Sequence, residues 1–313
     1  MARWGPIVRR PGSNSGPVSG CTSTGLRPAV SEAPYEQTNP GTTLELLADT
    51  GHDTVFLSLL KGDLSQLSGT LNLDGGGGGD DLFAYDQLSG APIAYVVTDD
   101  SLQRGALTVS HTGFESLTLQ AGAKNDDIEV RSLAVPTTLL AGGGADTIRV
   151  DSNGADPGGT VDGILSTLTV DGGIDASGDL LMANDSGDAT ADQLTIDDHT
   201  LGAAGGDSYF GAGGSIVYDR LDELFIDTGR GADTIHVLST ASGTTTTVNG
   251  EQGDDAFVVS TLDGFDHRTG TVDGIRSKLV LWGDAGDDTL VVDDATDPSG
   301  DHVTITNDWV GEH

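Results

Sequence analysis

Residues 71–85 read LNLDGGGGGDDLFAY, and residues 279–292 read LVLWGDAGDDTLVV. In both stretches apolar residues recur two apart on either side of a Gly-rich break that ends in aspartate. A period of two is typical of β-strands that bury one face. Glycines adopt the positive φ angles of tight corners without a steric penalty. Each stretch is therefore predicted to form two short strands joined by a corner.

The same plan occurs eight times. Its recurring acid is Asp53, Asp80, Asp126, Asp146, Asp179, Asp233, Asp255 and Asp288. Two residues after these aspartates stand Val55, Leu82, Ile128, Ile148, Leu181, Ile235, Phe257 and Leu290. Further apolar residues stand four residues after each aspartate and seven residues before it, or nine before Asp179. These positions predict the inward-facing row of one shared core.

A longer period lies above this one. Asp126 and Asp233 are 107 residues apart, and GTVDGI occurs at both 159–164 and 270–275. Single repeats of this kind cannot bury an apolar face alone and must stack. We expect an all-β fold, a parallel β-helix or β-roll-like solenoid with about 27 residues per turn and a super-repeat of about 108 residues. Residues 41–313 would form it as a partial module 41–115, a module 116–222 and a module 223–313, within a longer array.

The charge is strongly negative and unevenly distributed. The chain has 14 Lys and Arg against 49 Asp and Glu, a net charge of −35; the four arginines and two glutamates of residues 1–40 leave −37 for residues 41–313. Nucleic acids and anionic membranes both need a basic face, so we expect neither as a partner. No apolar run is long enough for a membrane span. Residues 1–40 are rich in Pro, Ser and Gly and are predicted to be disordered.

Stacked turns would place the recurring aspartates about 4.8 Å apart in a column. At an effective dielectric constant of about 20, two carboxylates at that separation repel by about 3.5 kcal/mol. Protons or cations must intervene. Ca²⁺ fits, because it takes about six to eight oxygen ligands and a Gly-rich corner exposes carbonyls beside the carboxylates. Second acids add ligands at several corners: Asp81, Asp127, Asp254 and Asp287.

The segment DGGGGGDDLF matches the nonapeptide G-G-x-G-x-D-x-U-x across Gly75–Phe83, and GDAGDDTLV and AGGGADTIR come close. Residues 41–313 therefore resemble RTX (haemolysin-type) calcium-binding repeats, and their long modules resemble the β-strand-repeat arrays of very large secreted or surface proteins. The resemblance implies metal ligation by the motif aspartates. With the second acids, the candidate metal ligands are Asp53, Asp80, Asp81, Asp146, Asp233, Asp254, Asp255, Asp287 and Asp288.

The chain also departs from the RTX pattern. RTX nonapeptides follow one another directly, whereas here the motif recurs once in 20 to 54 residues, so a turn without the motif is expected after Asp80 and after Asp179. Lys124 and Ser177 replace a motif glycine, which leaves Asp126 and Asp179 outside the candidate ligands. Aspartate also caps N–H groups in tight turns without any metal. A metal-free structural role is therefore the alternative, although capping alone would not require a charge of −37.

A second acidic group recurs at the module end. Asn184, Asp185, Asp188 and Asp192 correspond to Asp293, Asp294, Asp297 and Asp301. Their spacing does not match an EF-hand loop, and we expect a solvated acidic loop.

Catalysis is the rival hypothesis, because parallel β-helices also serve as polysaccharide lyases and epimerases. The seven histidines share no repeat position, and His236 is predicted to lie on the outer surface. HExxH, GxSxG and P-loop motifs are absent from the sequence.

The sequence thus favours a non-enzymatic, calcium-binding structural solenoid segment of a large secreted or cell-surface protein. It would act as a spacer or adhesive stalk, with surface glycans or other cell-surface proteins as candidate partners. A β-helix polysaccharide-active enzyme and a metal-free structural solenoid remain as alternatives. The extracellular location is inferred from Ca²⁺ availability and from the resemblance.

Overall fold

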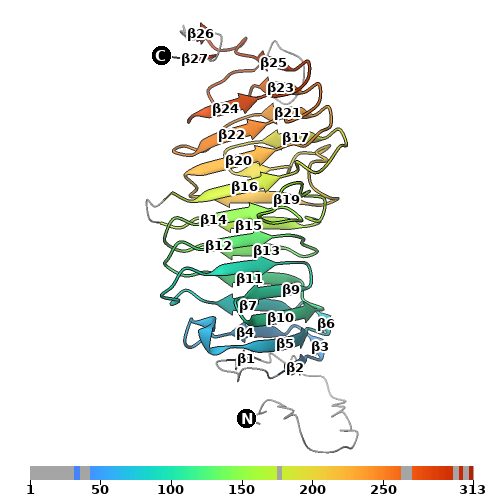
Figure 1. The fold of residues 1–313 in the computed structure, drawn as a ribbon, viewed down its shortest axis with the longest axis vertical. Coiled ribbons are helices and arrows are strands. Elements are labelled where there is room, and N and C mark those ends of the chain that lie inside the picture. The colour runs from blue at the N-terminus through green and yellow to red at the C-terminus, as the bar shows by residue number, and fades with distance from the viewer. Residues whose placement is uncertain are drawn as a thin grey trace, which may run out of the picture.

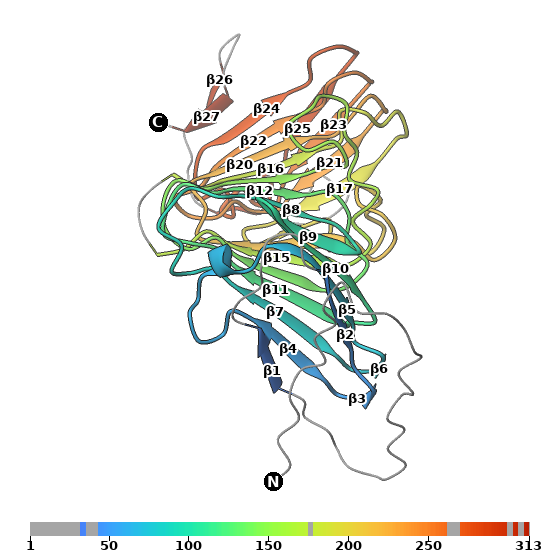
Figure 2. The ribbon, with the colours of Figure 1, turned by 60° about the horizontal axis from the view of Figure 1, so that its bottom comes forward.

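The computed structural model describes residues 32–35, 43–174, 178–261, 270–298, 303–305 and 310–312. Within these residues the fold is all-β, apart from one 3-10 turn, η1 (Leu64–Gln66). Two long sheets run side by side along the molecule, with the N-terminal strands at one end and the C-terminal strands at the other (Figures 1 and 2). The predicted all-β class with parallel stacking is confirmed.

We call the 12-stranded sheet sheet A. In spatial order its strands are β1 (Glu32–Tyr35), β4 (Thr54–Leu57), β7 (Asp81–Tyr85), β11 (Ser116–Gln120), β13 (Thr137–Leu140), β15 (Thr167–Asp171), β19 (Ser215–Asp219), β18 (Thr200–Leu201), β17 (Gln193–Ile196), β21 (Thr234–Val237), β23 (Ala256–Val259) and β25 (Thr289–Val292). β1 lies in the segment that was predicted to be disordered, and its backbone pairs in parallel with β4. The other residues of 1–40 lie outside the described residues.

Sheet B has 11 strands. In spatial order they are β2 (Thr43–Leu47), β5 (Gly69–Asp74), β10 (Leu107–Thr112), β9 (Ser101–Arg104), β8 (Ala94–Val97), β12 (Asp127–Val130), β14 (Thr147–Val150), β16 (Leu180–Asn184), β20 (Glu223–Asp227), β22 (Thr245–Asn249) and β24 (Leu279–Trp282). Two small pairs complete the fold: β3 (Thr50–Gly51) with β6 (Gly77–Gly78), and β26 (Val303–Ile305) with β27 (Val310–Glu312).

The strands before and after each motif aspartate lie in different sheets, and most neighbouring strands are parallel. β5 and β7, for example, flank Asp80 and belong to sheets B and A. This topology is compatible with a β-solenoid. Val55 pairs with Leu82, Ile128 with Ile148 and Ile148 with Leu181, at separations of 27, 20 and 33 residues. A constant turn length is therefore not observed.

The inward row predicted from the sequence forms the core between the sheets. Of the eight residues that stand two after a motif aspartate, Val55, Leu82, Ile128, Ile148, Leu181, Ile235 and Phe257 are at most 3% exposed. Only Leu290 is exposed, in β25, which ends sheet A. The buried side chains belong to one continuous cluster that joins successive strands.

Two antiparallel meanders interrupt the stack, β8–β9–β10 in sheet B and β17–β18–β19 in sheet A. After each meander, the strand that follows a motif aspartate changes sheet. The chain passes from B to A at Asp53 and Asp80, from A to B at Asp126, Asp146 and Asp179, and from B to A again at Asp233, Asp255 and Asp288. The motif corners therefore change twice from one edge of the molecule to the other.

Candidate functional site

The motif aspartates line the corners between the sheets and are buried. Asp53, Asp80, Asp126, Asp146, Asp179, Asp233 and Asp255 are at most 3% exposed. Asp288, at the last described corner, is exposed. Asp126 and Asp179, which depart from the glycine pattern, occupy the same kind of position as the others. The sequence rule that excluded them was too strict about their place in the fold.

Each buried aspartate is bonded to the corner of the next turn. The main-chain N–H of Asp53 donates to Oδ1 of Asp80 at 2.6 Å. The same bond joins Asp126 to Asp146 at 2.6 Å, Asp146 to Asp179 at 2.8 Å, Asp233 to Asp255 at 2.8 Å and Asp255 to Asp288 at 3.0 Å. We call these columns the carboxylate ladders. A carboxylate that accepts a buried backbone N–H links two turns that are distant in the sequence.

The turns that lack the motif also contribute a carboxylate. Asp80 N–H donates to Oε2 of Glu115 at 2.5 Å, and Asp179 N–H donates to Oδ2 of Asp222 at 2.9 Å. Both acids directly precede a strand, β11 or β20, rather than following a Gly-rich break. The sequence reasoning missed them as ligands of the ladder, although the similarity of TGFESLTL and RLDELFI was the available signal.

Three ladders result. The first comprises Asp53, Asp80 and Glu115; the second comprises Asp126, Asp146, Asp179 and Asp222; the third comprises Asp233, Asp255 and Asp288. The second and third begin at a meander, where Ile93 N–H donates to Asp126 at 2.7 Å and Asp192 N–H donates to Asp233 at 2.8 Å.

The second carboxylate oxygens are oriented toward the Gly-rich side of the corner. Gly122 N–H donates to Oδ2 of Asp126 at 3.0 Å. At Gly250, a Cβ atom would lie 2.3 Å from Oδ2 of Asp255, so only glycine fits there. Among the described residues, Oδ2 of Asp80 and Oδ2 of Asp255 are buried and have no hydrogen-bond partner. Buried polar atoms of this kind are uncommon and call for a ligand or a proton.

The second acids lie outside the ladders. Asp81 is half-buried and accepts a hydrogen bond from the hydroxyl of Ser116. Asp254 and Asp287 are exposed, and Asp287 N–H donates to Oδ1 of Asp254 at 2.9 Å. These candidate ligands therefore form an outer row beside the buried aspartates.

Burial raises the pKa of several of these carboxyl groups. Loss of solvent raises the pKa of Asp255 to about 6, despite the hydrogen bond from Asp233 N–H. The same cause raises the pKa of Asp227 to about 6 and shifts the pKa values of Asp126 and Asp233 upward. The hydrogen bonds to the ladders thus offset only part of the desolvation of their charges.

These shifts predict a stability that increases as the pH falls toward 5. An acid whose folded-state pKa exceeds its model value of 3.8 binds more protons when folded, so stability is lost as the pH rises from about 4 to about 6. In EGTA, thermal unfolding followed by circular dichroism should therefore occur at a higher temperature at pH 5 than at pH 7.5. A lower melting temperature at pH 5 would show that the ladders do not take up protons.

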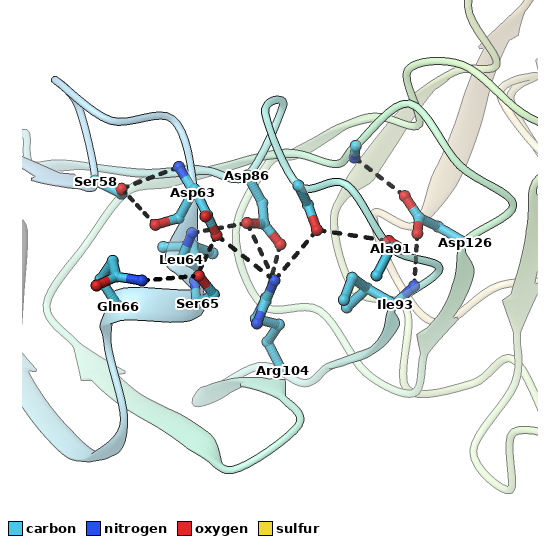
Figure 3. A network of polar contacts seen from close by, with 12 residues as sticks. Ser58, Asp63, Leu64, Ser65, Gln66, Asp86, Ala91, Ile93, Arg104 and Asp126 are labelled. Carbon is cyan, nitrogen blue, oxygen red and sulfur yellow. Dashed lines mark hydrogen bonds and ion pairs between the residues drawn. The ribbon is translucent and has the colours of Figure 1, made fainter. Parts of the chain in front are cut away.

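A further buried acid follows β7. Asp86 is fully buried. Its carboxylate accepts hydrogen bonds from the Arg104 Nε at 2.7 Å, from the Tyr95 hydroxyl at 2.5 Å and from Leu64 N–H at 2.7 Å. Figure 3 shows Arg104 reaching from the meander to Asp86, with Asp126 of the second ladder beside this group. The sequence reasoning did not identify this ion pair.

The acidic group at the end of the middle module is not a solvated loop, and that expectation was wrong. Asp185 is fully buried, and Asp188 and Asp192 are half-buried. The next turn stacks on them: Asp185 N–H donates to Asp227 O at 3.1 Å, and Arg230 N–H donates to Asp188 O at 2.8 Å. One carboxylate oxygen from each of the three aspartates lies within 4.8 Å of the others.

The carboxyl groups of this cluster have shifted pKa values. Burial, with smaller contributions from Asp188 and Asp192, raises the pKa of Asp185 to about 8. Burial likewise raises the pKa of Asp192 to about 6. At 4.8 Å, each pair of charges repels by about 3.5 kcal/mol at an effective dielectric constant of about 20. The cluster is therefore a strong site for a bound cation or proton.

His236 was predicted on the surface, but it is only 2% exposed. It lies between Thr195 and Val258 in sheet A, and both neighbours are buried as well. The hydroxyl of Thr195 donates to Asp207 at 2.8 Å, so the chain between β18 and β19 covers this part of the outer face.

No protein-family model and no curated protein matches the chain. Its likeness to RTX repeats therefore depends on the motif and its corners alone. None of the described helical segments is long and apolar enough to cross a membrane.

Proposed function

We propose that the chain is a calcium-binding structural solenoid segment of a larger secreted or cell-surface protein, in which it acts as a spacer or adhesive stalk. The observation that carries this proposal is the set of three carboxylate ladders. They place a buried acid at the corner of nearly every turn and bond it to the backbone of the next. An extended array held in this way resists bending, which is what a spacer requires.

Two observations support calcium over a purely structural role for the ladders. The first is charge: the sequence from residue 41 onward carries −37, and most of the buried ladder acids have no basic partner. The second is the pair of buried oxygens of Asp80 and Asp255 that lack a hydrogen-bond partner among the described residues. Carboxylates beside exposed carbonyls are the ligands that Ca²⁺ prefers. The outer acids, such as Asp254, would complete or screen such sites.

The backbone bonds of the ladders also support the metal-free alternative, in which the aspartates are hydrogen-bond acceptors and nothing else. The two interpretations differ in what chelation does. If the aspartates only accept N–H groups, removing divalent ions leaves every bond of the ladder in place. If they also bind Ca²⁺, chelation leaves repelling charges along each edge.

We expect the melting temperature to fall by about 10 °C or more when Ca²⁺ is replaced by EGTA at pH 7.5. An ion that binds only the folded state stabilises it by about 2.7 kcal/mol per site at 100 times Kd, and several sites contribute together. Circular dichroism at rising temperature measures the effect, with Mg²⁺ at the same concentration as the control for ionic strength. Equal melting temperatures in Ca²⁺ and EGTA would contradict a calcium-binding function.

A further inference from the structure

Two buried aspartates occupy equivalent places in successive modules. Asp86 stands six residues after Asp80, and Asp185 stands six residues after Asp179. Each directly follows a strand, β7 or β16, and precedes an antiparallel meander. Both are fully buried, and each accepts an N–H from the preceding turn, Leu64 at 2.7 Å or Val161 at 2.9 Å.

In the first module the chain itself neutralises this carboxylate. Arg104, from the middle strand of the meander, pairs with Asp86 at 2.7 Å. Its Nη2 also donates to the hydroxyl of Ser89, three residues after Asp86, at 3.3 Å (Figure 3). Ile93, seven residues after Asp86, then begins the second ladder through Asp126. A guanidinium thus occupies the space between the buried acid and the ladder.

The second module has no guanidinium at this place and has two more acids instead. The positions of Ser89 and Ile93 correspond to Asp188 and Asp192. No Lys or Arg occurs between Arg149 and Arg220, and the middle strand of this meander, β18, has the sequence Thr200–Leu201.

The surroundings of Asp185 contain an oxygen without a partner and no compensating charge. Oδ2 of Asp185 is buried and has no hydrogen-bond partner among the described residues. The charged groups that act on it are Asp188, Asp192 and Asp162, all of the same sign. Arg230 is close through its main chain, but its side chain is exposed and forms no ion pair in the described part of the chain.

We propose that Asp185, Asp188 and Asp192 bind a Ca²⁺ ion at the start of the third ladder, in the place that Arg104 takes at the start of the second. A buried charge needs a partner, and three converging carboxylates suit a hard divalent cation. The ion joins the corner after β16 to Asp192, whose N–H donates to Asp233. This site is separate from the ladders and does not require that the ladders themselves bind metal.

The same loop recurs one module later. Val272 N–H donates to Asp294 at 3.2 Å, and Asp297 N–H donates to Asp294 O at 3.3 Å, where Asp188 N–H donates to Asp185 O at 2.8 Å. The counterpart of Asp192 is Asp301, which lies outside the described residues. Residual binding at this second copy is therefore expected when the first is removed.

The test is a calorimetric titration of the full chain with Ca²⁺. Asp188→Asn should lower the number of bound ions by one per chain, and Asp185→Asn should do the same. Asp156→Asn, which changes an exposed acid of the same module, should bind like the wild type. Asp255→Asn reports on the ladders. Loss of an ion in Asp188→Asn but not in Asp255→Asn supports the module-boundary site even if the ladders bind no metal.

Melting curves give a second readout that a merely structural Asp185 would not produce. Asp185→Asn keeps the oxygen that accepts Val161 N–H but removes the buried charge. In EGTA it should melt above the wild type, and in Ca²⁺ it should lose the wild-type gain. Wild-type isotherms for both Asp185→Asn and Asp188→Asn would overturn the proposal, and a wild type that binds no Ca²⁺ would overturn both this site and the calcium part of the proposed function.

Discussion

Replacing Arg104 with methionine should destabilise the protein by about 3–5 kcal/mol, among the largest effects of any single change at a polar residue. The substitution keeps the length of the side chain but leaves Asp86 fully buried without its cation. Breaking one partner of a buried ion pair has this effect because the remaining charge is not solvated. Chemical denaturation with urea, followed by circular dichroism, measures the change in the free energy of unfolding.

Arg131→Met is the matched control, because Arg131 pairs with Glu129 at 2.6 Å while 42% of its side chain is exposed. Such pairs contribute about 1 kcal/mol or less. A second variant, Arg104→Met with Asp86→Leu, should recover much of the lost stability, since an apolar pair replaces a buried ion pair. If Arg104→Met were no more destabilising than Arg131→Met, the guanidinium would not be the partner that neutralises Asp86.

The inward row of the core could be predicted from the sequence because its signal is local. Residues two apart in one strand share a face, and eight copies of one pattern place Val55 and Phe257 in the same role. The order of turns was predictable for the same reason: Asp255 was expected directly beside Asp288, and its N–H bonds to that carboxylate.

The change of sheet at the two meanders could not be predicted from that pattern. A strand looks the same whether it belongs to sheet A or sheet B, and only long-range pairing assigns β12 to the sheet that holds β5. The antiparallel returns β9 and β18 are short and carry no motif. Turn length failed similarly, because loops of different length leave the strand register unchanged.

The acidic group around Asp185 was misjudged for a different physical reason. Acids in a polar stretch are solvated unless another part of the chain covers them, and the cover here comes from the turn after β20. The contrast between Arg104 and Asp188 became interpretable only once both meanders were seen to occupy equivalent places. Sequence alone places a charge in a module, whereas its burial depends on the next module.

Leu119→Asp should destabilise the protein by about 4 kcal/mol or more, and it tests the inward register directly. Leu119 is fully buried in β11, between Ala84 of β7 and Leu139 of β13. The change removes a core side chain and buries a charge without a partner. Effects of this size are expected only from such mechanisms.

Thr118→Asp is the control within the same strand. Thr118 is half-buried on the opposite face, between Phe83 and Thr138, and the same new charge there remains in contact with water. We expect a loss of about 1 kcal/mol or less. Urea unfolding of the two variants at pH 7.5, in Ca²⁺, compares them under conditions that keep any bound ions in place. Because a slip of one residue would exchange the two faces, a larger loss for Thr118→Asp than for Leu119→Asp would show that β11 is out of register in the stack.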